Sequence, residues 1–367
     1  MDYEAVIVGS GVIGLAIARE LSIAGINVLL IEKNHRSGEE ISSRNSGVIH
    51  AGMYYPSNSL KATFCVLGNS YLYDYINEKG ISYKKTGKLI VASSETELEK
   101  LKNIYSQGLI NGVSISMLSS NAVKEIEPNI NCLKAIHSPN TGIIDVPEYI
   151  TSLEGDIQHN NSYVSFNTEF ISSKRDNKSF ITKIKSNNDI FEISSKFLIN
   201  SAGLHSENIL NNLKGINKKN IHKIYYGKGH YYKYSGKNPF NHLIYPIPGP
   251  GGLGIHVGMD IGGQLRFGPD IEWIDYIDYS FDGSLKKKFI KAIKSYWPSL
   301  NEEKLQPDYT GIRPKLSSRN ESSKDFIINS EINHGIQGFI SLEGIESPGL
   351  TSSMAIGKYV SRLLLKN

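Results

Sequence analysis

A glycine-rich turn near the start of the chain limits the fold more than any other feature of the sequence. Residues 4–8 form an apolar run typical of a buried strand, and Gly9-Ser10-Gly11-Val12-Ile13-Gly14 follows it directly. Apolar residues then recur at helical spacing as far as Gly25, and residues 27–31 form a second apolar run. Two buried strands joined by a helix predict a strand–helix–strand unit with a parallel sheet.

The glycines of this turn have separate physical roles in binding a nucleotide. Gly9 permits the tight turn, Gly11 lets the backbone approach a pyrophosphate, and Gly14 lets the helix pack against the strand. The helix N-terminus adds free N–H groups and a partial positive charge for the phosphates. Glu32 ends the second strand, where it can accept hydrogen bonds from both ribose hydroxyls. We therefore expect an ADP moiety here, which leaves NAD and FAD as candidates.

The composition indicates a globular protein with a small-molecule substrate. Apolar residues make up 40% of the 367 residues and charged residues 21%, and the net charge is only +4. A nucleic-acid partner is not expected, because the basic run Lys286–Lys288 is short and typical of a solvated helix face. A mildly positive protein suits a small anionic substrate.

The cysteines and the N-terminus bear on compartment. Cys65 and Cys132 are far apart, which gives neither a disulfide framework nor metal-ligand spacing. Asp2 and Glu4 stand where a signal peptide needs basic residues, and we find no apolar run long enough to span a bilayer. We expect a cytoplasmic location, with peripheral membrane contact left open.

Three later segments favour FAD over NAD. The polar loop at residues 42–52, the strand end at residues 200–203 and the helix start at residues 347–351 are of the type that surrounds a flavin. A terminal helix that begins at the flavin would direct N–H groups at the ring edge where negative charge collects on reduction. An NAD enzyme has no need of such a helix.

These segments resemble the FAD-dependent oxidoreductases of the D-amino-acid oxidase superfamily, in particular the L-2-hydroxyglutarate dehydrogenase/oxidase branch. The matching motifs span nearly the whole chain and comprise residues 45–55, 59–62, 87–92, 141–145, 245–248, 254–256, 267–269, 311–314, 347–348 and 351–353.

The resemblance implies a mixed α/β fold, in which a Rossmann-like FAD-binding domain is interleaved with an antiparallel-sheet substrate domain. The expected boundaries are residues 1–85, 145–215 and 310–367 for the FAD-binding domain and 86–144 and 216–309 for the substrate domain. The residues expected to bind non-covalent FAD are Gly9, Gly11, Val12, Ile13, Gly14, Glu32, Lys33, Arg44, Asn45, Ser46, Gly47, Val48, Ala202, Gly203, Pro348, Gly349, Leu350 and Thr351.

The candidate catalytic residues are an arginine and two histidines. Arg313 matches the arginine that clamps a substrate carboxylate in many members, and a guanidinium suits a bidentate grip. Removing the hydroxyl proton of a hydroxy acid suits a histidine that titrates near neutrality, which makes His50 and His256 the candidate bases. His50 is favoured for its place in the polar loop.

Tyrosines of the expected pocket wall are candidates for substrate binding. Tyr54 and Tyr245 are the expected donors to a carboxylate, although most of the 21 tyrosines must serve packing. Tyr55, Lys61 and His230 are weaker candidates, and each has an equally good structural explanation.

The resemblance breaks before the last helix. The hydroxyglutarate branch carries a His-x-Arg-Asn-Ala-Pro-Ser-Pro stretch, whereas residues 341–348 read Ser-Leu-Glu-Gly-Ile-Glu-Ser-Pro. Glu343 and Glu346 would weaken the binding of an anion unless they point away from it.

The expected activity is the oxidation of a small L-2-hydroxy acid, with L-2-hydroxyglutarate as the candidate, to the 2-oxo acid. Oxygen or a quinone would then accept the electrons. The alternatives are an amine or amino-acid oxidase, a glycerol-3-phosphate dehydrogenase-like enzyme, and a flavoprotein subunit without turnover of its own.

Overall fold

The computed structural model describes residues 1–247 and 254–365, so Pro248 of the motif at residues 245–248 lies outside the described residues. The chain divides into two compact units. The first comprises Met1–Ser43, Val146–Tyr226 and Arg313–Asn367, and the second comprises Arg44–Asp145 and Gly227–Ile312. The largest difference from the expected boundaries is residues 44–85, which belong to the second unit.

The first unit is built on a sheet whose parallel part contains the predicted strand–helix–strand element. Val6 pairs with Leu29 on one side and with Leu198 on the other, and all three side chains are buried. The parallel strands lie in the order β9–β2–β1–β12–β21. Their bounds are β1 (Tyr3–Val8), β2 (Val28–Ile31), β9 (Tyr163–Ser165), β12 (Asp189–Asn200) and β21 (Phe339–Glu343).

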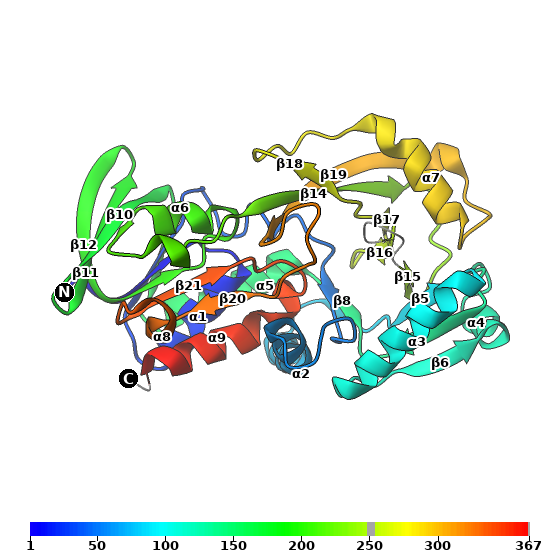
Figure 1. Ribbon diagram of the computed structural model, residues 1–367, viewed down its shortest axis with the longest axis horizontal. Coiled ribbons are helices and arrows are strands. Elements are labelled where there is room, and N and C mark those ends of the chain that lie inside the picture. Colours follow the sequence, from blue (N-terminus) through cyan, green and yellow to red (C-terminus); the bar gives the residue numbers. More distant parts are fainter. Residues whose placement is uncertain (248–253, 366–367) are drawn as a thin grey trace. The chain divides into compact units, whose positions relative to one another are not determined.

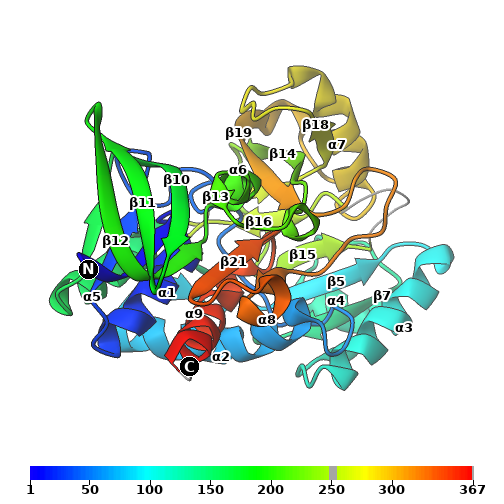
Figure 2. The same ribbon diagram turned by 60° about the vertical axis from the view of Figure 1, so that its left-hand side comes forward.

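Strand β12 has two kinds of neighbour. Its first half continues an antiparallel ribbon of β10 (Thr168–Asp176) and β11 (Ser179–Ser186) (Figure 2). The alternating sequence pattern of residues 162–198 is typical of such strands. The last residues of β12, Phe197 to Asn200, join the parallel sheet beside β1. The change follows burial, because the ribbon half is largely exposed while the last four residues are all buried. The remaining strands of the sheet are β13 (Leu213–Lys214) and β20 (Ile327–Asn329).

Helices α1 (Val12–Ile23), α5 (Val146–His159) and α9 (Gly349–Leu365) pack together in the first unit, and α9 is drawn red beside α1 in Figure 1. A Cβ atom on Gly357 would lie 2.6 Å from the carbonyl oxygen of Ala16, so glycine permits the close crossing of α9 over α1. The shorter helices of this unit are η1 (Gly203–His205), α6 (Ser206–Asn211), η2 (Lys218–Asn220) and α8 (Glu331–His334).

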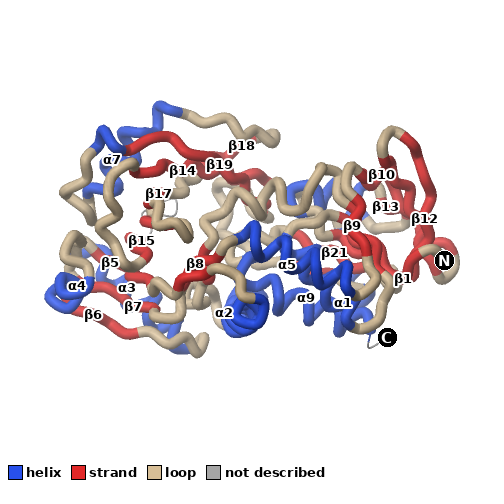
Figure 3. The backbone as a smooth tube through the Cα atoms, turned by 180° about the vertical axis from the view of Figure 1, so that it is seen from behind, coloured by secondary structure: helices blue, strands red, loops and turns tan. Residues whose placement is uncertain are grey.

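The second unit has its own largely antiparallel sheet, in the order β18–β14–β17–β16–β15–β5–β7–β6, with β19 beside β14. Helices α3 and α4 pack on β5, β6 and β7 (Figure 3). The strands are β5 (Lys88–Ala92), β6 (Ser116–Ser119), β7 (Lys134–Ser138), β14 (Tyr225–Tyr234), β15 (Leu243–Pro246), β16 (Val257–Met259), β17 (Leu265–Phe267), β18 (Glu272–Ile274) and β19 (Leu305–Lys315). A small sheet adds β3 (Val48–Ile49), β4 (Tyr83–Lys84) and β8 (Gly142–Ile144).

Local sequence signals set the helix ends in the second unit. The Ser59 hydroxyl caps α2 (Leu60–Lys79) by accepting from Ala62 N, and Gly80 ends the helix in the left-handed conformation. Ser94 and Glu97 form a capping box at the start of α3 (Glu95–Ile110). The other helices are α4 (Ser120–Ile126), η3 (Gly283–Leu285), α7 (Lys286–Lys294) and η4 (Glu302–Lys304).

Helix α7 ends at Lys294, three residues before Trp297. Pro298 disfavours the helical conformation for Trp297, and that indole instead packs against Tyr234, Phe240 and Phe267. The expected α/β fold class is confirmed. Within residues 1–247 and 254–365, no helix combines the length and apolar character needed to cross a membrane.

Candidate active site

The glycine-rich turn in the first unit has the close approaches that its sequence predicts. Gly9 has a φ of 99°, and a Cβ atom there would lie 2.9 Å from the carbonyl oxygen of Ser201. A Cβ atom on Gly14 would lie 2.0 Å from Gly9 O, so a larger residue must move the backbone of the turn. Gly11 caps α1 without a side chain, and the first turn of α1 carries no acid. The positive end of α1 therefore has no acidic side chain of its own turn to offset it.

Glu32 holds the shape of this turn. Its Oε2 atom accepts hydrogen bonds from Ser10 N at 2.9 Å and Ser10 Oγ at 3.0 Å, and Oε1 accepts from Asn34 N at 2.9 Å. The carboxylate is buried at the end of β2, where the ribose-binding acid was predicted.

Lys33 lies in a polar cluster beside the turn. Its Nζ atom is 2.8 Å from Glu40 Oε1 and 2.7 Å from His205 Nε2. Burial raises the pKa of Glu40, but the hydrogen bonds and charges of His205 and Lys33 outweigh it and hold this pKa at about 2. Lys33 thus supports the loop through Glu40, while Ala202 and Gly203 form the start of η1 nearby in the same unit.

The start of α9 is a polar, buried helix end. Thr351, Ser352 and Ser353 have little or no exposed surface, and Tyr149 OH lies 2.7 Å from Ser353 Oγ. Ser352 Oγ is buried and finds no hydrogen-bond partner among the described residues. Such an orphaned hydroxyl is suited to a bound group, because buried polar atoms normally have a partner. The predicted residues Pro348, Gly349 and Leu350 lie at this same helix end.

The predicted loop at residues 44–48 belongs to the second unit. Arg44 Nη1 donates to Thr310 O at 3.2 Å, and its guanidinium lies 4.3 Å from the ring centre of Tyr279. Asn45 Oδ1 accepts from Gly47 N at 2.7 Å, which closes a tight turn before Val48 begins β3. Ser46 Oγ lies 3.0 Å from Tyr231 OH.

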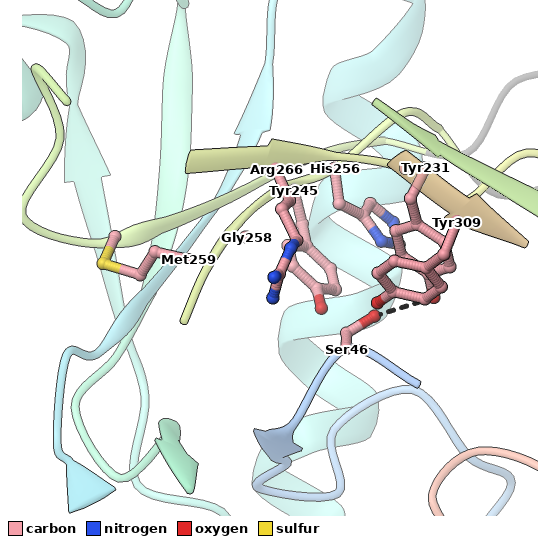
Figure 4. Close-up of a pocket in the computed structure, with 9 residues that line it drawn as sticks. Ser46, Tyr231, Tyr245, His256, Gly258, Met259, Arg266 and Tyr309 are labelled. Atoms are coloured by element: carbon pink, nitrogen blue, oxygen red, sulfur yellow. Dashed lines mark hydrogen bonds between the residues drawn. The ribbon is translucent and has the colours of Figure 1, made fainter. Parts of the chain in front are cut away.

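Ser46 also lines a pocket formed by side chains from β14 to β19 (Figure 4). Tyr245 and His256 stack here with ring centres 3.6 Å apart and planes 6° apart, so the structure brings a predicted substrate residue and a predicted base together. Tyr231 and Tyr309 form a second stack at 4.5 Å. The full lining is Ser46, Tyr231, Tyr245, His256, Gly258, Met259, Arg266, Gly268 and Tyr309.

His50 is not a histidine that titrates near neutrality. Burial, and to a lesser degree the charge of Lys88, lower the pKa of His50 to about 3. A near-neutral pKa is the ordinary value for histidine. The sequence does not show that buried Lys88 acts on His50. His50 is therefore a neutral imidazole in the protein alone.

Arg313 has an unsatisfied donor. It lies on β19, is half-buried, and its Nη1 atom is buried without a hydrogen-bond partner among the residues that the structure describes. By contrast, Arg266 in the pocket is held by Asp308 at 2.9 Å and Asp260 at 3.3 Å. Sequence reasoning missed Arg266, whose pocket position depends on three short strands pairing.

The weaker candidates lie outside the pocket lining. His230 Nδ1 lies 3.0 Å from Asp270 Oδ1, and both side chains are buried. The exposed Lys288 reaches the same carboxylate, with its Nζ atom 2.8 Å from Asp270 Oδ2. Lys288 stays on the exposed helix face expected for the run at residues 286–288. Lys61 is buried near the start of α2, and Tyr55 is half-buried.

Comparison with known proteins decides the family. The DAO model, described as FAD dependent oxidoreductase, matches residues 4–363. The chain belongs to this family of FAD-dependent oxidoreductases.

Its relatives include the mitochondrial L-2-hydroxyglutarate dehydrogenase of Arabidopsis thaliana, 38% identical over 99% of this chain and 83% of the relative. The glycerol 3-phosphate dehydrogenase of Caloramator mitchellensis is 33% identical over 99% of this chain and 74% of the relative. Among solved structures, the FAD-bound L-α-glycerophosphate oxidase of Mycoplasma pneumoniae matches with a TM-score of 0.87 and 28% identity, covering 99% of this chain and 94% of that one.

The residues present fit the FAD of this family. The N-terminus of α1, whose first turn carries no acid, and the cradle of Gly9, Gly11 and Gly14 suit a pyrophosphate. Buried Glu32 suits a ribose. The orphaned Ser352 hydroxyl at the start of α9 supplies a further polar atom for a bound group.

The two acids that break the hydroxyglutarate motif are both paired inside the first unit. His222 Nδ1 lies 2.9 Å from Glu343 Oε2, and Ser341 Oγ donates to Glu343 Oε1. Burial raises the pKa of Glu343, and His222 and Ser341 offset part of that shift. Lys315 Nζ lies 2.7 Å from Glu346 Oε2. Each acid thus faces a partner within its own unit.

Proposed function

We propose that this FAD-dependent oxidoreductase oxidises an L-2-hydroxy acid to the 2-oxo acid, with L-2-hydroxyglutarate as the first candidate. Relatives named for that activity support the proposal, at 38% identity in Arabidopsis thaliana and 30% in Dictyostelium discoideum. The observation within the chain that carries it is the buried, unsatisfied Nη1 atom of Arg313.

A buried guanidinium donor without an acceptor is costly unless a ligand supplies one. A carboxylate satisfies it with short charge-assisted hydrogen bonds and, when gripped by two N–H groups, is fixed in orientation. Because the carboxylate of a 2-hydroxy acid is attached to the carbon that is oxidised, Arg313 would also orient the C2–H bond. The sequence predicts the same role for Arg313.

Bound FAD supplies the hydride acceptor for such a reaction. The protein must also take the hydroxyl proton, and an imidazole nitrogen of His50 or His256 is the proposed acceptor. The low pKa of His50, about 3, leaves its ring neutral but makes it a weak base in the protein alone. The ring face of His256 stacks on Tyr245. The two ring nitrogens lie at the edge of the imidazole, outside this stacking contact.

The cofactor is proposed to be non-covalent, with oxygen or a quinone as the final acceptor. Burial raises the pKa of the Cys65 thiol to about 12, which leaves it a protonated, weak nucleophile, and Cys132 is also buried.

Glycerol 3-phosphate is the second candidate substrate, because relatives of both kinds, a dehydrogenase and an oxidase, are named for it. Solved glycine oxidases and related enzymes are at most 18% identical and share the fold alone. Amine oxidation and a flavoprotein without turnover are therefore treated as outcomes of the test.

The test is anaerobic reduction of the purified flavoprotein by L-2-hydroxyglutarate, glycerol 3-phosphate, glycine and L-proline. We expect L-2-hydroxyglutarate to bleach the flavin absorbance most efficiently. Arg313→Ala should lower kcat/KM by on the order of 100-fold or more while FAD stays bound. Arg319→Ala, at an exposed arginine six residues away, is the matched control and should change nothing. Bleaching only by amines, or by no compound, would overturn the proposal.

A further inference from the structure

Lys88 is a buried lysine whose position the proposed reaction does not yet explain. It is the first residue of β5, and its backbone pairs with Ser138 on β7 and with Leu243 on β15. Only 1% of its surface is exposed, which places it among the largest fully buried side chains of the protein. Lysine is almost never buried to this extent without a partner for its charge.

The surroundings of Lys88 contain aromatic rings instead of a carboxylate. Its Nζ atom lies 4.5 Å from the ring centre of Tyr245 and 5.0 Å from that of Tyr54. Ring faces stabilise an ammonium group only in part. Within residues 1–247 and 254–365, no ion pair joins Lys88 to an acid.

Lys228 shows what a buried lysine looks like when the protein satisfies it. It is 3% exposed on β14 of the same unit, and its Nζ atom donates to Asp278 Oδ2 at 2.9 Å and to Ser280 Oγ at 3.3 Å. The two lysines are alike in burial and differ in having an acidic partner. The difference indicates that an anion from outside the chain completes the surroundings of Lys88.

Lys88 is also next to the groups predicted to handle substrate. Tyr245 contacts it and stacks on His256 in the pocket of Figure 4. The charge of Lys88 acts on His50, and both residues belong to the second unit. Arg266, a cation that lines this pocket, is already paired with two aspartates.

We propose that Lys88 binds a second anionic group of the substrate, a carboxylate or a phosphate at the end remote from the oxidised carbon, with Tyr54 and Tyr245 flanking it. The assignment rests on the proposed function, the oxidation of an anionic substrate. It names the substrate class as dianions and makes Lys88 a specificity-determining residue.

The titration of Lys88 agrees with this role. Burial lowers the pKa of Lys88 to about 8, so most of the population carries the charge at neutral pH. The groups that face it are uncharged there, because burial lowers the pKa of His50 to about 3, raises that of Cys65 to about 12 and raises that of Tyr54 well above its usual range. Tyr245 adds a phenol ring. The positive charge at this point is therefore that of Lys88.

The experiment compares ligands that differ by one charge and need no turnover. Glutarate is a dianion and pentanoate a monoanion of the same length, and the binding of each to the holoenzyme is read from the flavin spectrum. We expect Lys88→Met to weaken glutarate by on the order of 100-fold and pentanoate by less than about 3-fold. Lys228→Met, the matched control, should leave the ratio unchanged.

Two further measurements keep the test decisive if Lys88→Met fails to fold. Lys88→Arg keeps the charge and should retain a preference for glutarate. In the unaltered protein, the preference for glutarate over pentanoate should fall as the pH rises through about 8, the pKa of Lys88 before a ligand binds. A preference that is flat from pH 6 to about 10 would overturn the proposal.

Kinetic experiments distinguish a substrate carboxylate from a substrate phosphate as the group that Lys88 binds. L-2-hydroxyglutarate is compared with L-2-hydroxypentanoate, and glycerol 3-phosphate with glycerol, by anaerobic flavin reduction. If no hydroxy acid reduces the flavin but glutarate discrimination is lost in Lys88→Met, the proposed function is wrong and the assignment of Lys88 holds. If L-2-hydroxyglutarate reduces the flavin and Lys88→Met discriminates as before, the assignment is wrong and the function stands.

Discussion

Two buried sites, one in each unit, hold charge in opposite ways. In the first unit, Glu343 lies against His222 and Glu346 against Lys315, so both acids have cationic partners within the chain. In the second unit, Lys88 is equally buried, but its neighbours are the rings of Tyr54 and Tyr245. A buried charge with a partner is part of the fold, whereas one without a partner indicates a site for a ligand.

Replacing Glu346 with alanine is the strongest test of this difference between paired and unpaired buried charges. Its carboxylate is almost inaccessible and holds Lys315 through both oxygens, at 2.9 and 2.7 Å. Glu346→Ala leaves the ammonium group of Lys315 without this acid, so we expect the free energy of unfolding to fall by about 3 kcal/mol. Urea denaturation of the FAD-bound protein measures the change. A loss below about 0.5 kcal/mol would mean that this pair does not stabilise the first unit.

Replacing Lys88 with methionine should stabilise the protein, in contrast to the loss of Glu346. Lys88→Met removes a charge that the protein leaves without an acid, so we expect the free energy of unfolding at neutral pH to rise by about 1–3 kcal/mol. Thermal unfolding without substrate checks this. Lys228→Met, which breaks an ion pair, should destabilise under the same conditions. If both lysine variants destabilise, the contrast between paired and unpaired lysines is false.

The pH dependence of stability gives a smaller effect with a definite direction. The pKa of Lys88 is lowered in the folded state to about 8, against its ordinary value of 10.5. Between these values the unfolded chain binds more protons, so the contribution of Lys88 to the free energy of unfolding rises with pH from about 8 to 10.5. The difference between the protein and Lys88→Met should therefore shrink across this window. A constant difference would contradict the lowered pKa.

The smallest predicted effect concerns His50. Lys88 lowers the pKa of His50, but burial is the larger cause. In Lys88→Met we therefore expect the pKa of His50 to rise only slightly, by less than about one unit, and to stay acidic. NMR titration of the imidazole measures it, with His256 in the same spectra for comparison. No change would separate the lysine from the candidate base.

Much of the nucleotide site could be predicted because its signals are local. Gly9, Gly11 and Gly14 lie within six residues, and each has a steric reason that the sequence alone shows. The two roles of β12 could not be predicted, because its parallel partner β1 lies about 190 residues earlier in the chain. The hydrophobic pattern indicates an antiparallel ribbon, but it does not show which strand pairs with the second half of β12.

The chemistry of isolated residues was harder to predict. Lys88 is visible in the sequence only as the polar end of an apolar strand, and nothing nearby shows whether an acid will face it. Glu343 finds its partner His222 at a separation of 121 residues, so the sequence could not show that this acid is neutralised. Pairing of buried charges depends on tertiary structure, and it decided the interpretation of both the motif break and Lys88.

The most direct test of the account is an anaerobic titration of the unaltered, FAD-containing protein with L-2-hydroxyglutarate. We expect the flavin to be fully reduced and one 2-oxo acid to form per flavin. The same bleaching by L-2-hydroxypentanoate should require a far higher concentration of that acid. A flavin that stays oxidised, or equal half-saturation by the two acids, would contradict the account.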